Sequence, residues 1–569
     1  MAKQEKAKQG KTSKFLKGWA LLPLGYEKKL QKSLFLIGFF LFGFWGTGQG
    51  QTERWVYRYN GPANDYDRAT SLDWGVDGNI YVAGVSKESS DTHSDFIVIS
   101  LTPEGNERWV YRYDGSAGEW DEANSLVCGA DGNIYAAGYS RGIGTYDDFT
   151  VISLTPDGNQ KWVYQYNGGG RGLRDEAFSV TYGADGNVYA AGRSWGEGTR
   201  ENFTVISLTS DGRERWVYQY DGPENEWDWA NSVIYGADSN IYAAGLSCGI
   251  LEDFIVISLT PDGNERWVYR YNGSGNYGDV AYSIVYGGDG NLYAAGVSYG
   301  RGTYSDFTVI SLTPDGNERW VYRYNGPGNE EEWAKSVAYG ADGNLYIAGS
   351  TWSIATHNDF LVISLTPDGN ERWVYRYNGP GNYDDRASSL VWGADGNIYI
   401  TGWSSDTITR SDITVITLTP DGNQRWVYRY NGLGNQSDVA GPIIYGGDGN
   451  LYIAGESRES VTYEDFTVIS LNPATGIEEE KGRVEEEDFF TIEKFARGEV
   501  KFSIFLSEPS PVNISLYNIE GKKITSWIVP GKRGRNWYRK NPPLLSSGVY
   551  FLKVEVRGKE ARGKCLFLK

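Results

Sequence analysis

DGNERWVYRYNG, residues Asp262 to Gly273, recurs letter for letter at Asp315 to Gly326 and at Asp368 to Gly379. The tryptophan of this phrase marks eight copies, at Trp55, Trp109, Trp162, Trp216, Trp267, Trp320, Trp373 and Trp426. Consecutive copies are separated by 54, 53, 54, 51, 53, 53 and 53 residues. A fixed period near 50 residues is typical of chains built from repeated structural units.

Each period contains four strand-like segments and no helical periodicity. In the first period these segments are RWVYRYNG from Arg54, ATSLDWG from Ala69, NIYVAG from Asn79 and DFIVISL from Asp95. Four strands per unit, repeated radially, indicate a β-propeller. The small residues of the Ala/Ser-rich segment suit the crowded centre, so we order a blade as A (Ala/Ser-rich), B (NIYVAG), C (DFIVISL) and D. The arginines of RWVYRYNG suit an outer edge, where they discourage edge-to-edge pairing.

The phase of the repeat predicts how the ring closes. The first repeat begins with a D strand at Trp55, and the last ends with a C strand at Asp465 to Leu471. We therefore predict that residues 53–60 pair with 465–471 and complete the last blade. The predicted fold is all-β: an eight-bladed propeller of four-stranded blades over residues 49–472, followed by a small β-sandwich.

The repeat also resembles a known family. The run DFTVISLTPDGNERWVYRYNG, with GADGNLYIAG further on, resembles the bacterial propeller repeats called SBBP and, more loosely, NHL-type blades. The resemblance covers roughly residues 53–472 and implies the propeller fold. It implies little about activity, because propellers host many unrelated functions.

The N-terminal segment predicts export. Nine lysines within residues 1–32 precede the apolar run LFLIGFFLFGFW from Leu34 to Trp45, and Gly46-Thr47-Gly48 offers small residues for cleavage. The run is short for a membrane span, so we interpret residues 1–48 as a signal peptide and expect no transmembrane helix in the mature protein. The alternative is an uncleaved anchor. The three cysteines indicate no disulfide framework and no CxxC metal site.

The loops divide between the two faces of the predicted disc. The A–B turns (GADGN or GGDGN) and the C–D turns (TPDGN) barely vary, and Asp-Gly is a strong hairpin signal. The D–A and B–C loops vary among copies and share the other face. Such variation suggests that this face, which we call the variable face, recognises a ligand. The alternative is drift in loops without a role.

Two rings of acids lie on the variable face. One acid comes two residues before the alanine of every A strand: Asp67, Asp121, Asp175, Asp228, Asp279, Glu332, Asp385 and Asp438. A second ring precedes the C strands: Asp95, Asp148, Asp253, Asp306, Asp359, Asp412 and Asp465, with Asn202 in the remaining copy. Such carboxylates can cap strand starts by accepting backbone N–H bonds. The alternative is calcium binding by oxygen-rich loops. No other cofactor is expected.

Aromatic residues accompany these acids and are the candidate binding residues. We assign them to the loops of the variable face: Tyr66, Trp120, Trp195, Trp227, Trp229, Trp333, Trp352 and Tyr383. Rings beside carboxylates can stack on sugars or on a protein partner. The alternative is that they pack between neighbouring blades.

The sequence indicates no catalytic residues. Four G-x-S-x-G matches, beginning at Gly138, Gly192, Gly245 and Gly296, end predicted strands and lack the following helix that a nucleophile elbow needs. The chain has only two histidines, His93 and His357, three blades apart. A polysaccharide hydrolase built on paired carboxylates stays open, but no pair is singled out.

Charge separates the body of the chain from its tail. Residues 49–472 hold 27 Lys+Arg against 58 Asp+Glu, a net of −31, whereas residues 495–569 hold 15 against 5, a net of +10. The whole chain is at −19, which argues against nucleic-acid binding. We interpret residues 473–494 as an acidic linker.

Residues 495–569 alternate apolar and polar positions with turn signals, which predicts the small sandwich. The segment resembles the C-terminal sorting domain of type IX secretion cargo. The motif residues are Asn513, Tyr517, Gly521, Lys522, Gly548 and Tyr550. This resemblance implies that the protein is exported and that the outer-membrane secretion machinery is its partner. It also implies that the tail is then removed or keeps the protein attached to the cell surface.

These observations predict a secreted or cell-surface propeller that binds a glycan or an extracellular protein through its variable face. Two alternatives stay open: a polysaccharide-acting hydrolase, and a structural surface component without a discrete ligand.

Overall fold

The computed structural model describes residues 52–88, 93–169, 174–196, 198–249, 251–275, 277–326, 328–406, 410–432, 435–459, 463–473, 490–492, 500–506, 509–518, 522–532, 534–540, 548–556 and 559–567. The predicted signal peptide, most of the predicted linker and Gly521 lie outside these residues. Within the described ranges, no helix has the length and apolarity that a membrane span requires.

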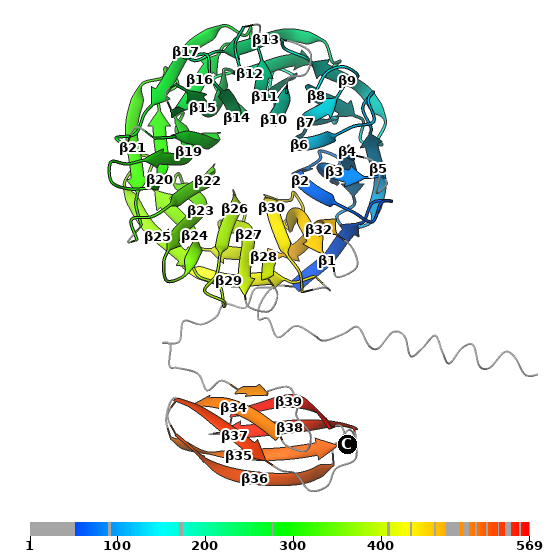
Figure 1. Ribbon diagram of the computed structural model, residues 1–569, viewed down its shortest axis with the longest axis vertical. Coiled ribbons are helices and arrows are strands. Elements are labelled where there is room, and N and C mark those ends of the chain that lie inside the picture. The colour runs from blue at the N-terminus through cyan, green and yellow to red at the C-terminus, as the bar shows by residue number, and fades with distance from the viewer. Residues whose placement is uncertain are drawn as a thin grey trace, which may run out of the picture. The chain divides into compact units, whose positions relative to one another are not determined.

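Eight four-stranded antiparallel sheets form the propeller (Figure 1). The innermost strands are β2 (Asp67–Trp74), β6 (Asp121–Cys128), β10 (Glu176–Tyr182), β14 (Asp228–Tyr235), β18 (Val280–Tyr286), β22 (Glu332–Tyr339), β26 (Asp385–Trp392) and β30 (Asp438–Tyr445). The second strands are β3 (Ile80–Lys87), β7 (Ile134–Arg141), β11 (Asn187–Trp195), β15 (Ile241–Cys248), β19 (Leu292–Tyr299), β23 (Leu345–Ser353), β27 (Ile398–Asp406) and β31 (Leu451–Arg458).

The outer half of each sheet is built from the two remaining strand types. The third strands are β4 (Ser94–Leu101), β8 (Asp147–Leu154), β12 (Glu201–Thr209), β16 (Glu252–Leu259), β20 (Ser305–Leu312), β24 (His357–Leu365), β28 (Arg410–Leu418) and β32 (Glu464–Asn472). The rim strands are β5 (Glu107–Tyr113), β9 (Gln160–Tyr166), β13 (Glu214–Tyr220), β17 (Glu265–Tyr271), β21 (Glu318–Tyr324), β25 (Glu371–Tyr377), β29 (Gln424–Tyr430) and β1 (Thr52–Tyr59).

The first strand closes the ring. The eighth sheet has the order β1-β32-β31-β30, in which Trp55 pairs with Ser470 and Tyr59 with Phe466. The predicted pairing of residues 53–60 with 465–471 and the count of eight four-stranded blades are therefore confirmed.

The core lies between consecutive blades rather than inside any one of them. The second and third strands are buried on both faces, so they read as nearly continuous apolar runs, while the rim strands are half-buried. Tyr81 and Phe96 of the first blade, for example, pack in one cluster with Leu126 and Ile134 of the second. Eight such clusters run around the described part of the ring. Each blade is thus stabilised by both of its neighbours.

In seven of the eight blades the repeated tryptophan fastens the rim strand to the next blade. Trp55 Nε1 donates a hydrogen bond to Pro103 O, and Trp373 Nε1 donates one to Pro420 O, both over 2.9 Å. These carbonyls belong to the turns between the third and fourth strands. Trp426 points to the eighth blade, where no such turn joins β32 to β1, and its buried Nε1 has no hydrogen-bond partner among the described residues.

A bulge recurs in every innermost strand. Ala69 pairs with Gly84 and Ser71 with Ala83, so that Thr70 between them has no partner across the strand pair. The same register shift follows the corresponding alanine in the other seven blades. A bulge adds a residue to one strand and redirects its side chain.

The C-terminal residues form two further sheets. Strands β33 (Phe490–Ile492), β34 (Val500–Leu506) and β37 (Gly534–Lys540) form one. Strands β36 (Lys523–Gly531), β35 (Ser510–Asn518), β38 (Gly548–Val556) and β39 (Lys559–Phe567) form the other. Because β33 pairs with β34, regular structure begins inside the segment 473–494 that we interpreted as a linker.

Candidate functional site

The invariant turns serve the fold. In the first blade, Asp77 Oδ2 accepts hydrogen bonds from Asn79 Nδ2 and Tyr81 Oη, both over 2.7 Å. The same arrangement recurs in the other blades. These turns therefore position the buried tyrosines of the second strands.

A pocket lies at this invariant end, where the sequence suggested only hairpin closure. Its volume is about 920 Å³, and its lining includes Tyr286, Tyr339 and Trp392 at the ends of three innermost strands. Each of these rings contacts a second-strand tyrosine of the preceding blade, as Tyr339 does with Tyr293 at a centroid distance of 5.9 Å. The sequence could have indicated this aromatic lining, because an aromatic residue ends seven of the eight innermost strands. In the second blade the corresponding residue is Cys128.

The first ring of acids fastens loops on the variable face. Asp121 is fully buried, and its Oδ2 and Oδ1 accept N–H bonds from Gly115 over 2.8 Å and from Arg141 over 3.2 Å. In the other blades the corresponding acid is also fully buried, and in most it accepts a glycine N–H. Each carboxylate thus holds the loop before its own strand, which agrees with a capping role.

Burial sets the acid–base behaviour of this ring. It raises the pKa of Asp121, Asp175 and Asp228 to about 6 and that of Glu332 to about 7. In Asp67, Asp279, Asp385 and Asp438 burial also raises the pKa. Hydrogen bonds from backbone N–H groups oppose the shift, because they favour the ionised form.

The second ring is mostly neutralised by rim-strand arginines. Arg112 pairs with Asp95 at 2.5 Å, and the same pairing recurs in three further blades. In the third blade Gln219 occupies the arginine position and Asn202 the acid position, so both charges are absent together. In the second blade, where Gln165 replaces the arginine, Thr145 and Asn167 donate to Asp148 over 3.0 and 3.1 Å.

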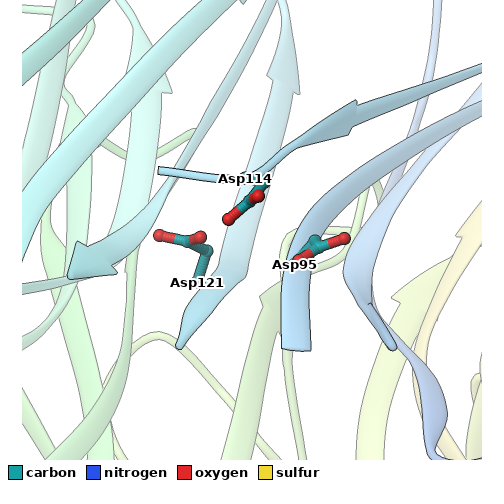
Figure 2. Close-up of side chains that lie close together, drawn as sticks. All are labelled: Asp95, Asp114 and Asp121. Carbon is teal, nitrogen blue, oxygen red and sulfur yellow. The ribbon is translucent and has the colours of Figure 1, made fainter. Parts of the chain in front are cut away.

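Calcium does not fit the first ring. The eight acids belong to eight different blades, at or just before the start of each innermost strand, so they do not converge on one point. Backbone N–H groups occupy only some of their oxygens, and Asp67 Oδ1, Asp228 Oδ1, Glu332 Oε2 and Asp438 Oδ1 have no hydrogen-bond partner among the described residues. Calcium takes six to eight oxygen ligands in one place. In the described part of the chain, one group of carboxylates does converge: Asp95, Asp114 and Asp121, each with an oxygen within 4.8 Å of the others (Figure 2). Asp95 is paired with Arg112 and Asp121 with backbone N–H groups, so two of the three have structural partners.

The G-x-S-x-G serines are not nucleophiles. Ser140, Ser194, Ser247 and Ser298 are fully buried. They face the first ring of acids across the strand pair, as Ser140 faces Asp121. His93 instead pairs with Glu119 at 3.6 Å and stacks edge-on against Trp120. No histidine reaches any of these serines in the described hydrogen bonds.

The candidate aromatic residues separate into two groups. Trp120, Trp227 and Tyr383 are exposed in loops, and Tyr66 is a half-buried loop residue. The assignment of the remaining four to loops was wrong: Trp195 ends β11, Trp229 lies in β14, Trp333 in β22 and Trp352 in β23. The strands extend further toward the variable face than the repeat boundaries suggested, because each innermost strand begins near its capping acid.

We call the residues that flank the alanine of each innermost strand the central ring. Those before the alanine are Arg68, Glu122, Glu176, Trp229, Val280, Trp333, Arg386 and Val439. Those after it, at the bulge, are Thr70, Asn124, Phe178, Asn231, Tyr282, Lys335, Ser388 and Gly441. In contrast to the buried alanines, nearly all of them are partly exposed. These positions differ strongly in chemistry from blade to blade, as does the position after the glycine of each second strand, which includes Arg193, Trp403 and Glu456.

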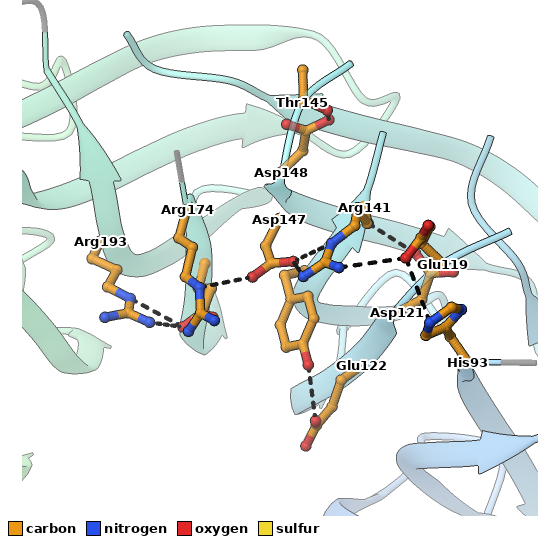
Figure 3. A network of polar contacts seen from close by, with 12 residues as sticks. His93, Glu119, Asp121, Glu122, Arg141, Thr145, Asp147, Asp148, Arg174 and Arg193 are labelled. Atoms are coloured by element: carbon orange, nitrogen blue, oxygen red, sulfur yellow. Dashed lines mark hydrogen bonds and ion pairs between the residues drawn. The ribbon is translucent and has the colours of Figure 1, made fainter. Parts of the chain in front are cut away.

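Ion pairs dominate the central ring and its surroundings in blades one to three (Figure 3). Arg68 pairs with Glu122, and Arg193 pairs with Glu176 at 2.7 Å and with Glu201 at 2.8 Å. Nearby, Arg141 pairs with Asp147 at 3.0 Å. Arg68 of the central ring and the neighbouring second-strand arginines Arg141 and Arg193 therefore all have carboxylate partners.

Aromatic side chains dominate the central ring in blades four to six, which contribute Trp229, Tyr282 and Trp333. Trp229 donates to Glu201 over 2.7 Å, and Arg193 lies 4.7 Å from its ring centroid. Tyr282 and Trp333, from adjacent blades, are nearly parallel, with centroids 6.1 Å apart and an interplanar angle of 9°. Lys335 Nζ lies 3.6 Å from the Tyr282 centroid and 4.7 Å from that of Trp333. Burial and the nearby Arg386 lower the pKa of Lys335 to about 8.

Comparison with known proteins points to the same architecture. Residues 340–370 match a β-propeller family described as a domain of unknown function, DUF5122. The photosystem II assembly lipoprotein Ycf48 of Synechococcus sp. (strain CC9902) is 26% identical over 265 residues, which cover 38% of this chain and 76% of that protein.

Solved structures with similar folds have low sequence identity to this chain. A eukaryotic initiation factor is 8% identical, with a TM-score of 0.33, over 83% of this chain and 98% of its own. An α-L-arabinofuranosidase from Fusarium graminearum is 10% identical, with a TM-score of 0.32, over 52% of this chain and 92% of its own. The eight sheets and the family match define a β-propeller repeat protein.

Proposed function

We propose that this chain is a secreted or cell-surface binding protein that recognises a glycan or an extracellular protein through its variable face. The central ring is the observation that carries the proposal. Repeated blades keep their structural residues, as the capping acids and the rim tryptophans do. The central ring instead differs from blade to blade, with ion pairs on one side and aromatic rings on the other. Ligand sites combine apolar rings with a few placed polar groups in this way.

A glycan array with the full chain tests this proposal. We expect binding to at least one glycan, reduced at least tenfold by Trp333→Ala, because sugar rings stack on aromatic faces. Trp227→Ala tests the exposed loops in the same way. Tyr111→Ala is the control and should leave glycan binding unchanged. Tyr111 lies on the rim strand β5, far from the centre, where its Oη donates a hydrogen bond to Gln160 Oε1. Arrays with calcium and with chelator should agree, since the first-ring acids belong to eight different blades and do not converge on one ion. An array that stays blank in both conditions would remove the glycan and leave a protein ligand.

Export is the second part of the proposal. The apolar run Leu34 to Trp45 supports an N-terminal signal peptide. The C-terminal segment supports type IX secretion through the motif positions that are described: Asn513 and Tyr517 in β35, Lys522, and Gly548 and Tyr550 in β38. We infer that its two sheets form a sandwich. Tyr538 of β37 supports this, because it packs against the buried cluster of Val512, Ile514 and Leu516 in the other sheet.

Expression in a bacterium that has a type IX system tests the export proposal. The full chain should reach the cell surface or the medium, and a chain that ends at residue 472 should stay in the periplasm, with at least a tenfold change in the outside fraction. Immunoblots of the separated fractions measure this, and a periplasmic marker enzyme controls for lysis. Equal release of both chains would contradict a sorting role for the tail.

A further inference from the structure

The central ring has a pair of cations without acidic partners. Lys335 and Arg386 lie on the adjacent innermost strands β22 and β26, and Arg386 is near enough to lower the pKa of Lys335 by charge repulsion. Among the described residues, neither side chain forms an ion pair. The equivalent of Arg386 in the first blade, Arg68, is paired with Glu122, and Arg193 on the second strand of the third blade is paired with Glu176. In a propeller with a net charge of −31 (27 Lys+Arg against 58 Asp+Glu), two uncompensated cations at one point are an exception.

Aromatic rings surround both cations. Lys335 Nζ lies against the faces of Tyr282 and Trp333, and the Arg386 guanidinium lies 5.7 Å from the centre of the Trp403 ring. Ring faces stabilise a cation that lacks a carboxylate, although more weakly than an ion pair in a buried site. The rings therefore allow the protein to keep both charges unpaired until an anion arrives.

The bulge explains how Lys335 reaches this position. Thr70, Asn124 and Asn231, at the same bulge in other blades, donate to the alanine carbonyl of the next innermost strand over 2.6 to 2.8 Å. This contact links neighbouring blades. Lys335 replaces the short polar side chain, and its amine lies on the rings instead. Lys335, like Phe178 and Tyr282 at the same position in other blades, forms no such bond among those described, and its side chain is available for another contact.

We propose that Lys335 and Arg386 bind the negative charge of an acidic sugar while Trp333 and Tyr282 contact its ring. The group recognised is a carboxylate or sulfate on a glycan that is otherwise uncharged. A lone anionic group suits two adjacent cations, whereas a dense polyanion would be repelled by the acidic body of the propeller. This inference rests on the proposed function and specifies its ligand class.

Titration calorimetry with the full chain tests the inference. Each charged probe carries a single anionic group: an aldobiouronic acid is compared with its methyl ester, and a monosulfated galactose disaccharide with its desulfated form. We expect at least one acid to bind at least tenfold more tightly than its neutral counterpart, and the pair that shows the difference identifies carboxylate or sulfate. Lys335→Met and Arg386→Gln should each remove most of that difference. Lys161→Met, at an exposed position of β9, makes the same charge change far from the site and should have no effect.

The pH profile separates a charge contact from a structural one. Lys335 is protonated below a pKa of about 8, so affinity for the acid should fall as the pH rises from 7 to 9. The other titratable groups that face this amine are Tyr282, whose pKa burial raises to about 12, and Arg386. Glu252 lies beyond Tyr282. Lys335→Arg should therefore bind at pH 7 and lose the pH dependence.

The outcomes distinguish the inference from the proposed function. Equal binding of acids and neutral counterparts, or full binding by both Lys335→Met and Arg386→Gln, overturns the inference. If Trp333→Ala still abolishes binding of a neutral glycan, the proposed function survives. If no acidic or neutral glycan binds, the inference fails together with the glycan form of the proposed function.

Discussion

Removal of residues 1–60 is expected to abolish the cooperative unfolding of the propeller. The truncation deletes β1, leaves β32 as an open edge, and removes Trp55, Tyr57 and Tyr59 from one inter-blade cluster and Val56 from another. Full burial of one large apolar side chain contributes roughly 1.5–3 kcal/mol. The four side chains are half-buried, so their loss amounts to about half of four such contributions, roughly 3–6 kcal/mol, which is a large part of the stability of a typical domain.

The matched control is a chain that lacks only residues 1–51, which keeps β1 intact. Guanidinium denaturation followed by tryptophan fluorescence should show a normal transition for this chain and a broad or absent one for the longer truncation. Coincident midpoints would mean that seven complete blades and one incomplete blade are stable without the closing strand.

Gly349→Ala is expected to destabilise the sixth blade by about 3 kcal/mol or more, at the upper end of overpacking costs. A Cβ at this position would lie 1.7 Å from Trp333 O and 2.8 Å from Trp333 C. The obstacle is the backbone of the bulged strand β22, which no rotamer change can relieve. Strands β22 and β23 must separate, and Trp333 and Lys335 must move with them.

Gly249→Ala is the matched control, because the nearest atom to its added Cβ is Leu251 O at an ordinary contact distance of 3.7 Å. Urea denaturation of the two variants should give a large drop in midpoint for Gly349→Ala and almost none for Gly249→Ala. Similar midpoints would show that the strand pair yields locally. If Gly349→Ala also loses glycan binding, this loss would indicate that the bulge positions the residues that contact the glycan.

The sequence predicts the blade well because each blade repeats the same local signals. Alternation, Asp-Gly turns and small residues at the centre locate all four strands, and the offset between the first and last copies predicts the closure by β1. The capping acids can also be recognised in the sequence, since they recur at a constant distance from the alanine of the innermost strand. A strand pattern that is ambiguous in one copy becomes reliable because it recurs in eight copies.

The central ring is harder to predict because its geometry depends on the bulge. Simple alternation places Lys335 on the same side as Trp333 and says nothing of Tyr282, which comes from another blade. The register shift between Ala334 and Ser336 redirects the side chain, and only the packing of adjacent blades brings the two rings together. A single sequence also gave no reason to separate the paired Arg193 from the unpaired Arg386, since their partners come from other strands.

The closing strand also determines how the ring responds to mechanical force. The chain enters the propeller at Thr52 and leaves it after Asn472, and these two residues are partners in the β1–β32 ladder. Tension between the two ends would peel this ladder apart from one end, one hydrogen-bonded pair at a time. The other seven blades are continuous hairpins and bear none of that load. A pull between the two ends should therefore open the ring at low force at its seam, while the rest of the disc stays folded.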